Sequence, residues 1–306
     1  MATLCQACSS SSTTPLLLAK RVFSLASSPY LFTSGYKTPR HCSSFRAFNS
    51  ASASTSVCVD LKELRSNELV DLEYAELNLM HKIFEDVGHV RIRQHVNPLS
   101  SSFSKPAPVP VWDEVYKDPS LPLMVDIGSG SGRFLLWLAN KDAGSRNYLG
   151  LEIRKKLVKR ANFWVDDLGL SNVHFIFANA MVSFEQLITS YPGPLEIVSI
   201  LCPDPHFKKR HQKRRVVQKP LVNSIIQNLK PGGKIFVQSD VLDVAQDMRD
   251  QFDEESNALQ HVDTVETEDD GWVMKNPMGI RTEREIHAEY EGARIYRRLY
   301  QKRQLT

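Results

Sequence analysis

Short apolar runs alternate with longer segments of helical periodicity from about residue 121 onward. Several short runs are apolar at every position, which is typical of strands buried on both faces of a sheet. The pattern predicts strands at 122–127, 147–152, 173–179, 196–202 and 234–240, and helices at 133–141, 154–168, 182–191 and 213–229. Regular strand–helix alternation predicts an α/β fold with a mostly parallel sheet and helices on both faces.

The C-terminal segment mixes Tyr290, Tyr296 and Tyr300 with arginines, a composition that can stack nucleic-acid bases. Gly292 interrupts any long helix in this segment. The simpler expectation is a short helix followed by a last strand of the sheet, with the tyrosines packed against the core.

Composition changes sharply near residue 59. The first acidic residue is Asp60, and the segment before it carries five basic residues and 14 serines. Such a segment, without a long apolar core, is typical of a cleaved organelle transit peptide, although a disordered tail has a similar composition. We therefore expect a disordered transit peptide at 1–58, an N-terminal extension and linker at 59–120, and the main domain at 121–306. Few arginines favour a chloroplast destination over a mitochondrial one.

Charge and cysteine content narrow the function classes. The chain has 38 Lys and Arg against 35 Asp and Glu, so its formal charge is +3, and no apolar stretch is long enough for a membrane helix. Without the leader's five positive charges, the remainder has 33 basic and 35 acidic residues and is slightly negative. Only Cys202 lies outside the leader, which excludes an internal disulfide framework and a thiolate zinc site. The other cysteines are Cys5, Cys8, Cys42 and Cys58.

The first predicted strand ends in a glycine-rich loop, Asp126-Ile-Gly128-Ser-Gly130-Ser-Gly132. Glycines there let the backbone approach a ligand closely, and the following helix start offers unpaired N–H groups. Dinucleotide sites use a different glycine spacing. The carboxylate of Asp126 suits the amino group of S-adenosylmethionine better than a pyrophosphate, which it would repel. A tight turn without a ligand is the alternative.

Polar side chains also follow the next two strands. Glu152 ends the second strand, where a carboxylate can accept hydrogen bonds from both hydroxyls of a ribose. Asn179 ends the third, where its amide could bind an adenine edge or simply cap the loop. Because ligands of open α/β sheets bind at the carboxyl ends of the strands, this edge is the expected nucleoside site.

The fourth strand leads into Cys202-Pro-Asp204-Pro-His-Phe207. Two prolines bracket Asp204 and should hold its carboxylate rigidly at the active edge. Six Lys or Arg residues follow within 208–215. A charge run is usually a solvated face, but beside this carboxylate it favours phosphate binding.

Together these motifs resemble the bacterial-type tRNA (guanine-N7) methyltransferases, class I S-adenosylmethionine enzymes that modify the variable-loop guanine of tRNA. The resemblance runs from about Arg91 to the C-terminus and is most specific in the Pro-Asp-Pro-His-Phe-Lys run. It implies a Rossmann-like class I methyltransferase fold, tRNA as partner and no obligatory protein subunit, hence a monomer or homodimer. The matching segments are 93–99, 126–132, 150–154, 203–211, 229–233, 238–240 and 282–285.

The resemblance also implies roles for single residues. Asp204 would be both catalytic and adjacent to the cofactor. The remaining cofactor contacts would be Asp126, Gly128, Gly130, Gly132, Glu152, Asn179 and Ala180, and the RNA or target base would meet Lys208, Asp240, Thr282, Glu283, Arg284 and Glu285. Many relatives carry Asp at the position of Asn179, which makes that contact the least certain. His95, His174 and His287 lack metal-ligand spacing, so no metal is expected.

Two other functions are compatible with part of the sequence. A methyltransferase with a small-molecule acceptor would keep the cofactor motifs, but the basic run beside Asp204 speaks against it. An RNA-binding protein that has lost catalysis would need a broken cofactor site, whereas the loop glycines, Glu152 and Asp204 are all present.

Overall fold

The computed structural model describes residues 64–79, 96–142, 144–262 and 264–304, all within one compact unit that spans Asp60–Thr306. The expected transit peptide with its four cysteines lies outside the described residues, as does the Arg93-Gln94-His95 part of the first matching segment. The division into leader, extension and main domain therefore stays a prediction. Among the described residues, no helix is long and apolar enough to cross a bilayer.

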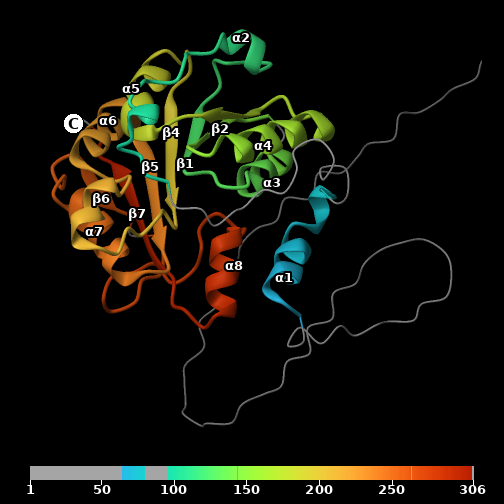
Figure 1. The fold of residues 1–306 in the computed structure, drawn as a ribbon. Helices are drawn as coiled ribbons and strands as arrows, with labels where there is room; N and C mark the ends of the chain where they lie inside the picture. Colours follow the sequence, from blue (N-terminus) through green and yellow to red (C-terminus); the bar gives the residue numbers. More distant parts are fainter. Residues whose placement is uncertain (1–63, 80–95, 143, 263, 305–306) are drawn as a thin grey trace, which may run out of the picture. The chain divides into compact units, whose positions relative to one another are not determined.

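A seven-stranded, mostly parallel sheet forms the centre of this unit, in the order β3-β2-β1-β4-β5-β7-β6 (Figure 1). The first five strands run parallel, whereas β7 is antiparallel to both β5 and β6. The strands are β1 (Leu123–Ile127), β2 (Asn147–Glu152), β3 (Val173–Phe177), β4 (Leu195–Leu201), β5 (Leu229–Ser239), β6 (Leu259–His261) and β7 (Tyr296–Lys302).

Helices cover both faces because successive side chains of a strand point to opposite sides. In β1, Val125 belongs to the apolar cluster under α5, α6 and α7, whereas Met124 belongs to the cluster under α3 and α4. The predicted α/β fold is confirmed. The helices are α1 (Ser66–Glu73), α2 (Trp112–Val115), α3 (Arg133–Lys141), α4 (Lys155–Leu168), α5 (Ala180–Thr189), α6 (Lys219–Asn228), α7 (Leu242–Asp253) and α8 (Glu283–Tyr290), with short 3-10 turns η1 (Ala75–Leu77), η2 (Ser101–Phe103) and η3 (Lys209–Arg214).

Several predicted boundaries were wrong, for local reasons. The strand expected at 234–240 begins at Leu229, because the Pro231-Gly232-Gly233 segment stays in the sheet through an irregularity opposite β4. The helix expected at 213–229 begins at Lys219, and the residues before it form η3 instead. Helix α7 was not predicted, although Val244, Met248 and Phe252 recur four residues apart.

The last part of the chain forms a short helix and then strand β7, as expected. Tyr300 is buried and Tyr296 is half-buried, but Tyr290 is 53% exposed, so its expected packing against the core was wrong. Helices α1 and α8 lie side by side (Figure 1). The Arg281 guanidinium binds Glu73 of α1 at 2.6 Å, and the Tyr74 hydroxyl donates to the Arg281 carbonyl.

A buried polar network fixes α8 to the sheet. The Glu285 carboxylate, fully buried, accepts from the Arg297 guanidinium at 2.5 Å and from the side-chain amides of Gln238 and Asn276 at 3.0 Å each. Thr282 caps the helix by accepting from the Glu285 N–H, and the Glu285 carboxylate accepts from the Thr282 N–H in return. Every charge in the network is thereby paired, as burial requires.

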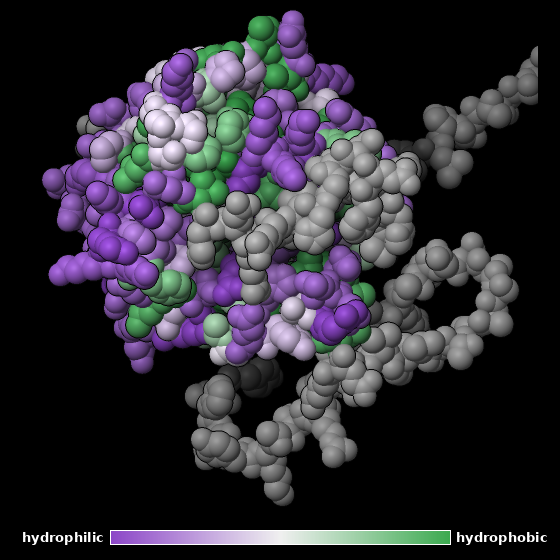
Figure 2. Space-filling view, in the orientation of Figure 1, coloured by the Kyte–Doolittle hydropathy of each residue, from purple (hydrophilic) through white to green (hydrophobic). Residues whose placement is uncertain are grey.

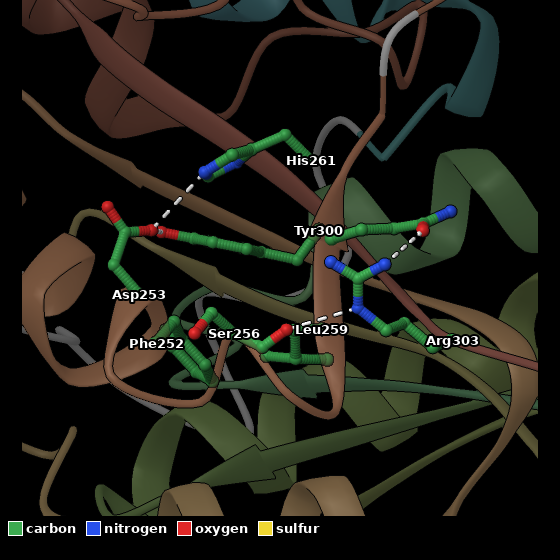
Figure 3. Close-up of a pocket in the computed structure, with 8 residues that line it drawn as sticks. Phe252, Asp253, Ser256, Leu259, His261, Tyr300 and Arg303 are labelled. Atoms are coloured by element: carbon green, nitrogen blue, oxygen red, sulfur yellow. Dashed lines mark hydrogen bonds and ion pairs between the residues drawn. The ribbon is translucent and has the colours of Figure 1, made fainter.

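One cavity of about 520 Å³ opens at the β6 edge of the sheet (Figure 3). Its polar groups mostly bind one another: Tyr300 donates to Asp253 at 2.9 Å, and Arg303 donates to the Ser256 carbonyl at 3.1 Å. The His261 ring is tilted by 41° to the Tyr300 ring, with 5.0 Å between their centroids, and lies 3.5 Å from Asp253. Because this cavity lies at the antiparallel edge, away from the carboxyl ends of β1 to β4, it holds none of the predicted site residues.

Replacing Glu285 with Gln should lower the free energy of unfolding by about 3–5 kcal/mol, because the buried Arg297 charge loses its counter-ion. Urea denaturation followed by circular dichroism measures the change. The exposed Glu114→Gln in α2 is the matched control and should change stability by less than about 0.5 kcal/mol. A loss below about 1 kcal/mol in the Glu285 variant would contradict the role of this pair.

Candidate active site

A pocket lies where β1, β2, β3 and β4 end at the carboxyl edge of the sheet. Five of the predicted site residues line it together: Gly128, Glu152, Asn179, Ala180 and Asp204. Its walls also include the apolar side chains of Ile127, Leu151, Ile153 and Met181. The parallel topology brings residues 128 and 204, far apart in sequence, to one cavity, as the sequence predicted.

The glycines of the first loop have different tasks. Gly128 has a φ of +83°, and a Cβ added there would meet nothing within 4 Å, so its backbone faces open space in the pocket. Gly132 has a φ of +87°, but a Cβ there would lie 2.8 Å from Ala161 and 2.9 Å from Phe175. Gly132 therefore allows α3 to pack closely on α4 and β3, and the structure gives it no place in the pocket wall.

Asp126 lies just behind the loop, only 4% exposed, and accepts a hydrogen bond from the Ser199 hydroxyl of β4 at 2.7 Å. Burial raises the pKa of its carboxyl group to about 7; the hydrogen bond from Ser199 opposes this rise, and the nearby Glu152 charge adds to it. Among the described residues, no positively charged side chain contributes to lowering this pKa. The site therefore holds a carboxylate that a ligand cation would stabilise.

Glu152 ends β2 with its carboxylate 2% exposed and hydrogen-bonded on both oxygens. One oxygen accepts from the Gly130 N–H at 2.9 Å, which explains how Gly130 contributes to the site without lining the pocket. The other accepts from the backbone N–H of Arg154 at 2.9 Å and from its Nε at 2.8 Å. This carboxylate thus joins the glycine loop to the turn that starts α4.

Arg154 is a pocket residue that the sequence analysis did not assign. Besides its bonds to Glu152, its pKa is held above the ordinary arginine value: burial works against the charged form, but Glu152 outweighs it, with help from Asp204 and Glu283. The Arg154 guanidinium therefore interacts electrostatically with both Glu152 and Asp204. The Glu-Ile-Arg sequence could have indicated this role, because a turn after Glu152 brings the Arg154 side chain back to the Glu152 carboxylate.

Asn179 serves as the cap of α5. Its side-chain oxygen accepts from the Met181 N–H at 3.2 Å, which ends β3 at Phe177 and starts the helix at Ala180, earlier than the predicted 182. Its amide nitrogen donates to the carbonyls of Pro98 and Phe103, at 3.0 and 3.2 Å. The capping alternative is therefore what the structure shows, and the residue also fastens segment 96–103 to the pocket wall.

Asp204 stands on a strained loop at the pocket mouth. Cys202 and His206 on either side have φ values of 50° and 43°, a left-handed region that side chains other than glycine rarely adopt. Such strain persists where the surroundings enforce it, often at functional sites. Arg215 supplies part of that enforcement, donating to the Pro205 carbonyl at 3.0 Å and pairing with Asp247 at 3.1 Å.

The buried position of Arg215 changes the predicted basic run. With its side chain 4% exposed, Arg215 anchors the loop and is not available to phosphates, so counting it among the phosphate ligands was wrong. The remaining basic side chains, from Lys208 to Arg214, lie in and beside η3, and Arg214 also lines the pocket. Phe207, directly before Lys208, is 69% exposed.

The other predicted RNA-contacting residues lie outside the pocket lining. Asp240 binds the Arg284 guanidinium at 2.5 Å, and Glu283 binds Arg133 of α3. Thr282 and Glu285 form the capping box described above. These contacts set the position of α8, whereas Lys208 is exposed at the start of η3.

The pocket fits a nucleoside cofactor with a cationic end. Gly128 leaves open backbone, Glu152 offers a carboxylate, and the apolar side chains can enclose a base. Buried Asp126 lies behind the same loop, and no positive side chain that the structure describes opposes the rise of its pKa. Among the described residues, no group of three or more His, Cys, Asp or Glu is placed to hold a metal ion, and the absence of a metal from the reaction stays a prediction.

Known proteins resemble this chain over most of the described part. Residues 120–298 match the putative methyltransferase family. A tRNA (guanine-N(7)-)-methyltransferase from a Synechococcus strain is 48% identical over 69% of this chain and 84% of its own length. Another from a Synechocystis strain is 46% identical over 71% of this chain and 99% of its own length. Among solved structures, an rRNA methylase from Streptococcus thermophilus matches 62% of this chain and 91% of its own chain, at 14% identity and a TM-score of 0.37.

Replacing Asp126 with Asn should change how stability depends on pH. Because burial raises the pKa of this carboxyl from 3.8 to about 7, its contribution to stability is present below pH 4 and lost as the pH rises through 7. Relative to Asp126→Asn, wild type should lose up to about 1.4 kcal/mol of unfolding free energy per pH unit in this window. Urea unfolding between pH 4 and 8 measures the difference, and parallel curves would contradict the raised pKa.

Proposed function

The chain belongs to the tRNA (guanine-N(7)-)-methyltransferase family, and on that premise we propose that it transfers a methyl group from S-adenosylmethionine to N7 of the variable-loop guanine in tRNA. The observation that carries the proposal is the convergence of Gly128, Glu152 and Asp204 on one pocket whose mouth is bordered by the basic η3 segment. A small-molecule acceptor would not need that basic border.

The pocket residues fit the parts of the cofactor. Asp126 would hold the amino group, since a cation nearby favours the ionised carboxylate that burial disfavours. Glu152 would accept from the ribose hydroxyls, which requires the Arg154 guanidinium to give up at least part of its pairing with the same oxygens. The cofactor supplies a methyl group bound to a positively charged sulfur.

The chemistry demands positioning more than proton transfer. Guanine N7 carries a lone pair in the base plane, so no proton has to leave before it attacks the methyl carbon. The S–C bond breaks as the N–C bond forms, the electron pair stays on sulfur, and the positive charge passes to the purine. Rigid placement of the base is therefore the main contribution, and the loop strained at Cys202 and His206 provides a fixed Asp204.

Asp204 would stabilise the charge that develops on the purine. A carboxylate beside the ring does so electrostatically, or by accepting from the N1–H and N2–H edge of guanine. The Arg154 guanidinium interacts electrostatically with Asp204 as well as with Glu152, which links the cofactor and acceptor ends of the pocket.

We also propose that the protein acts in chloroplasts. The acid-free, serine-rich composition of 1–58 supports this, as does the similarity to proteins from cyanobacteria, the group from which chloroplasts descend. Mitochondrial import is the alternative.

Incubation with labelled S-adenosylmethionine and unmodified tRNA tests the reaction. We expect label in the tRNA and, after borohydride and aniline treatment, a strand break at one variable-loop guanine, because this chemistry cleaves at 7-methylguanosine. Ribonuclease treatment of the acceptor should abolish incorporation. Methylation at another atom, or of a small molecule alone, would contradict the proposal.

Asp204→Asn should lower the single-turnover rate by roughly 10²–10³-fold, as expected when a group that stabilises transition-state charge is removed. S-adenosylmethionine affinity, measured by calorimetry, should change less than the rate does. Asp113→Asn, an exposed acid in α2, is the control and should leave both unchanged. Equal single-turnover rates in wild type and Asp204→Asn would refute the assignment.

Fluorescent fusions of the full chain and of a chain lacking 1–58 test the compartment in plant cells. The full chain should accumulate in chloroplasts, whereas the shortened chain should stay in the cytosol because its import signal is gone. Fluorescence of the full chain in mitochondria would favour the alternative, and identical cytosolic distributions would contradict an import role for 1–58.

A further inference from the structure

Helix α4 carries its charges in the order opposite to the one that its dipole favours. Exposed Lys155, Lys156 and Lys159 lie in its first two turns, and exposed Asp166 and Asp167 lie in its last turn. The positive end of a helix dipole is at its N-terminus, so lysines there and acids at the far end are each unfavourable. This arrangement lowers the stability of the free protein.

None of the side chains that the structure describes neutralises these lysines. Among the residues that the structure describes, Lys155, Lys156 and Lys159 have no ion pair or hydrogen bond from their side chains. Lys219, at the first position of α6, is a contrasting case, since it pairs with Glu254 at 3.1 Å and Glu255 at 2.5 Å. Unlike Lys219, the lysines at the start of α4 therefore have no counter-ion among the described residues.

The position of α4 suggests what neutralises it. The helix starts directly after Arg154, which lines the pocket. On another part of the same pocket wall, Arg214 leads back into η3, whose basic side chains also lack acidic partners among the described ion pairs. Two separate basic segments are thus each continuous in sequence with an arginine of the pocket wall. Figure 2 shows hydrophilic residues over much of the left side of this face, with hydrophobic areas toward its top and centre.

We infer that Lys155, Lys156 and Lys159 bind backbone phosphates of the tRNA, forming a second anchoring surface beside the η3 segment. The inference rests on the proposed function and adds to it the α4 surface. Phosphates supply the negative charge that the first turns of α4 lack, and their position along an RNA strand suits two basic segments flanking the target base. Lysines act there as point charges, so the surface holds the tRNA in place and does not read its sequence.

The double variant Lys155→Gln/Lys156→Gln tests the inference in the full chain. Its affinity for fluorescently labelled tRNA, measured by anisotropy, should fall about tenfold or more at 0.1 M salt, and the log–log salt slope should decrease by about 1.5–2. Its S-adenosylmethionine affinity should match wild type. Lys117→Gln/Lys234→Gln is the matched control, because both lysines are exposed, unpaired among the described residues and placed toward the amino edge of the sheet.

Two further readouts separate RNA binding from a structural role. Lys155→Arg/Lys156→Arg keeps the charges and should retain the wild-type slope. The glutamine variant should also melt roughly 1–4 °C higher than wild type, since it relieves the unfavourable dipole interaction. A lower melting temperature with reduced S-adenosylmethionine affinity would show that these lysines support the fold, and would overturn the inference.

The outcomes also distinguish this inference from the proposed function. If wild type methylates tRNA and the glutamine variant binds tRNA with unchanged affinity and slope, the α4 surface is wrong and the proposed function stands. If wild type neither binds nor methylates tRNA, both fail. An equal loss of affinity in the Lys117/Lys234 control would reduce the effect to net charge and overturn the assignment of α4.

Discussion

A buried carboxylate must have a partner on each oxygen, and Glu152 meets that requirement in a way that organises the whole site. Its partners come from the glycine loop after β1 and from the turn before α4, so one side chain fixes the relative positions of two strand ends. The cost of burying this charge is offset by hydrogen bonds that also shape the cofactor pocket. The Arg154 guanidinium, which binds the same carboxylate, also interacts electrostatically with Asp204.

A second polar unit supports the acceptor side of the site. Gln238 donates to Glu285 and also lies 3.7 Å from the Cys202 sulfur, at the base of the strained loop. Burial raises the pKa of that thiol to about 12, so Cys202 stays a neutral thiol at physiological pH. The placement of α8 on the sheet and the geometry of the loop carrying Asp204 are thus connected through β5.

Sequence patterns predicted the parts of this arrangement that depend on local periodicity and topology. Buried runs identified β1, β2 and β4, and parallel pairing placed Gly128, Glu152 and Asp204 at one edge. Periodicity could not predict side-chain partners that are distant in sequence. Glu285 binds Gln238, 47 residues away, and Arg215 binds Asp243, 28 residues away. Asn179 was ambiguous in the sequence because one amide can serve as cap or as ligand donor; the structure shows the cap on Met181 and the bonds to the Pro98 and Phe103 carbonyls, and the cofactor contact stays a prediction.

The attachment of α1 to α8 limits how much of the amino end the protein can lose. Arg65 and Glu68 close the first turn of α1, and Glu73 holds the Arg281 guanidinium immediately before the α8 cap. A peptidase that trimmed the chain past Glu73 would remove one of the two counter-ions of Arg281, leaving Glu289, and would also remove the α1 side chains that pack against α8. Proteolytic maturation that keeps the contacts between α1 and α8 must therefore cleave the chain before α1.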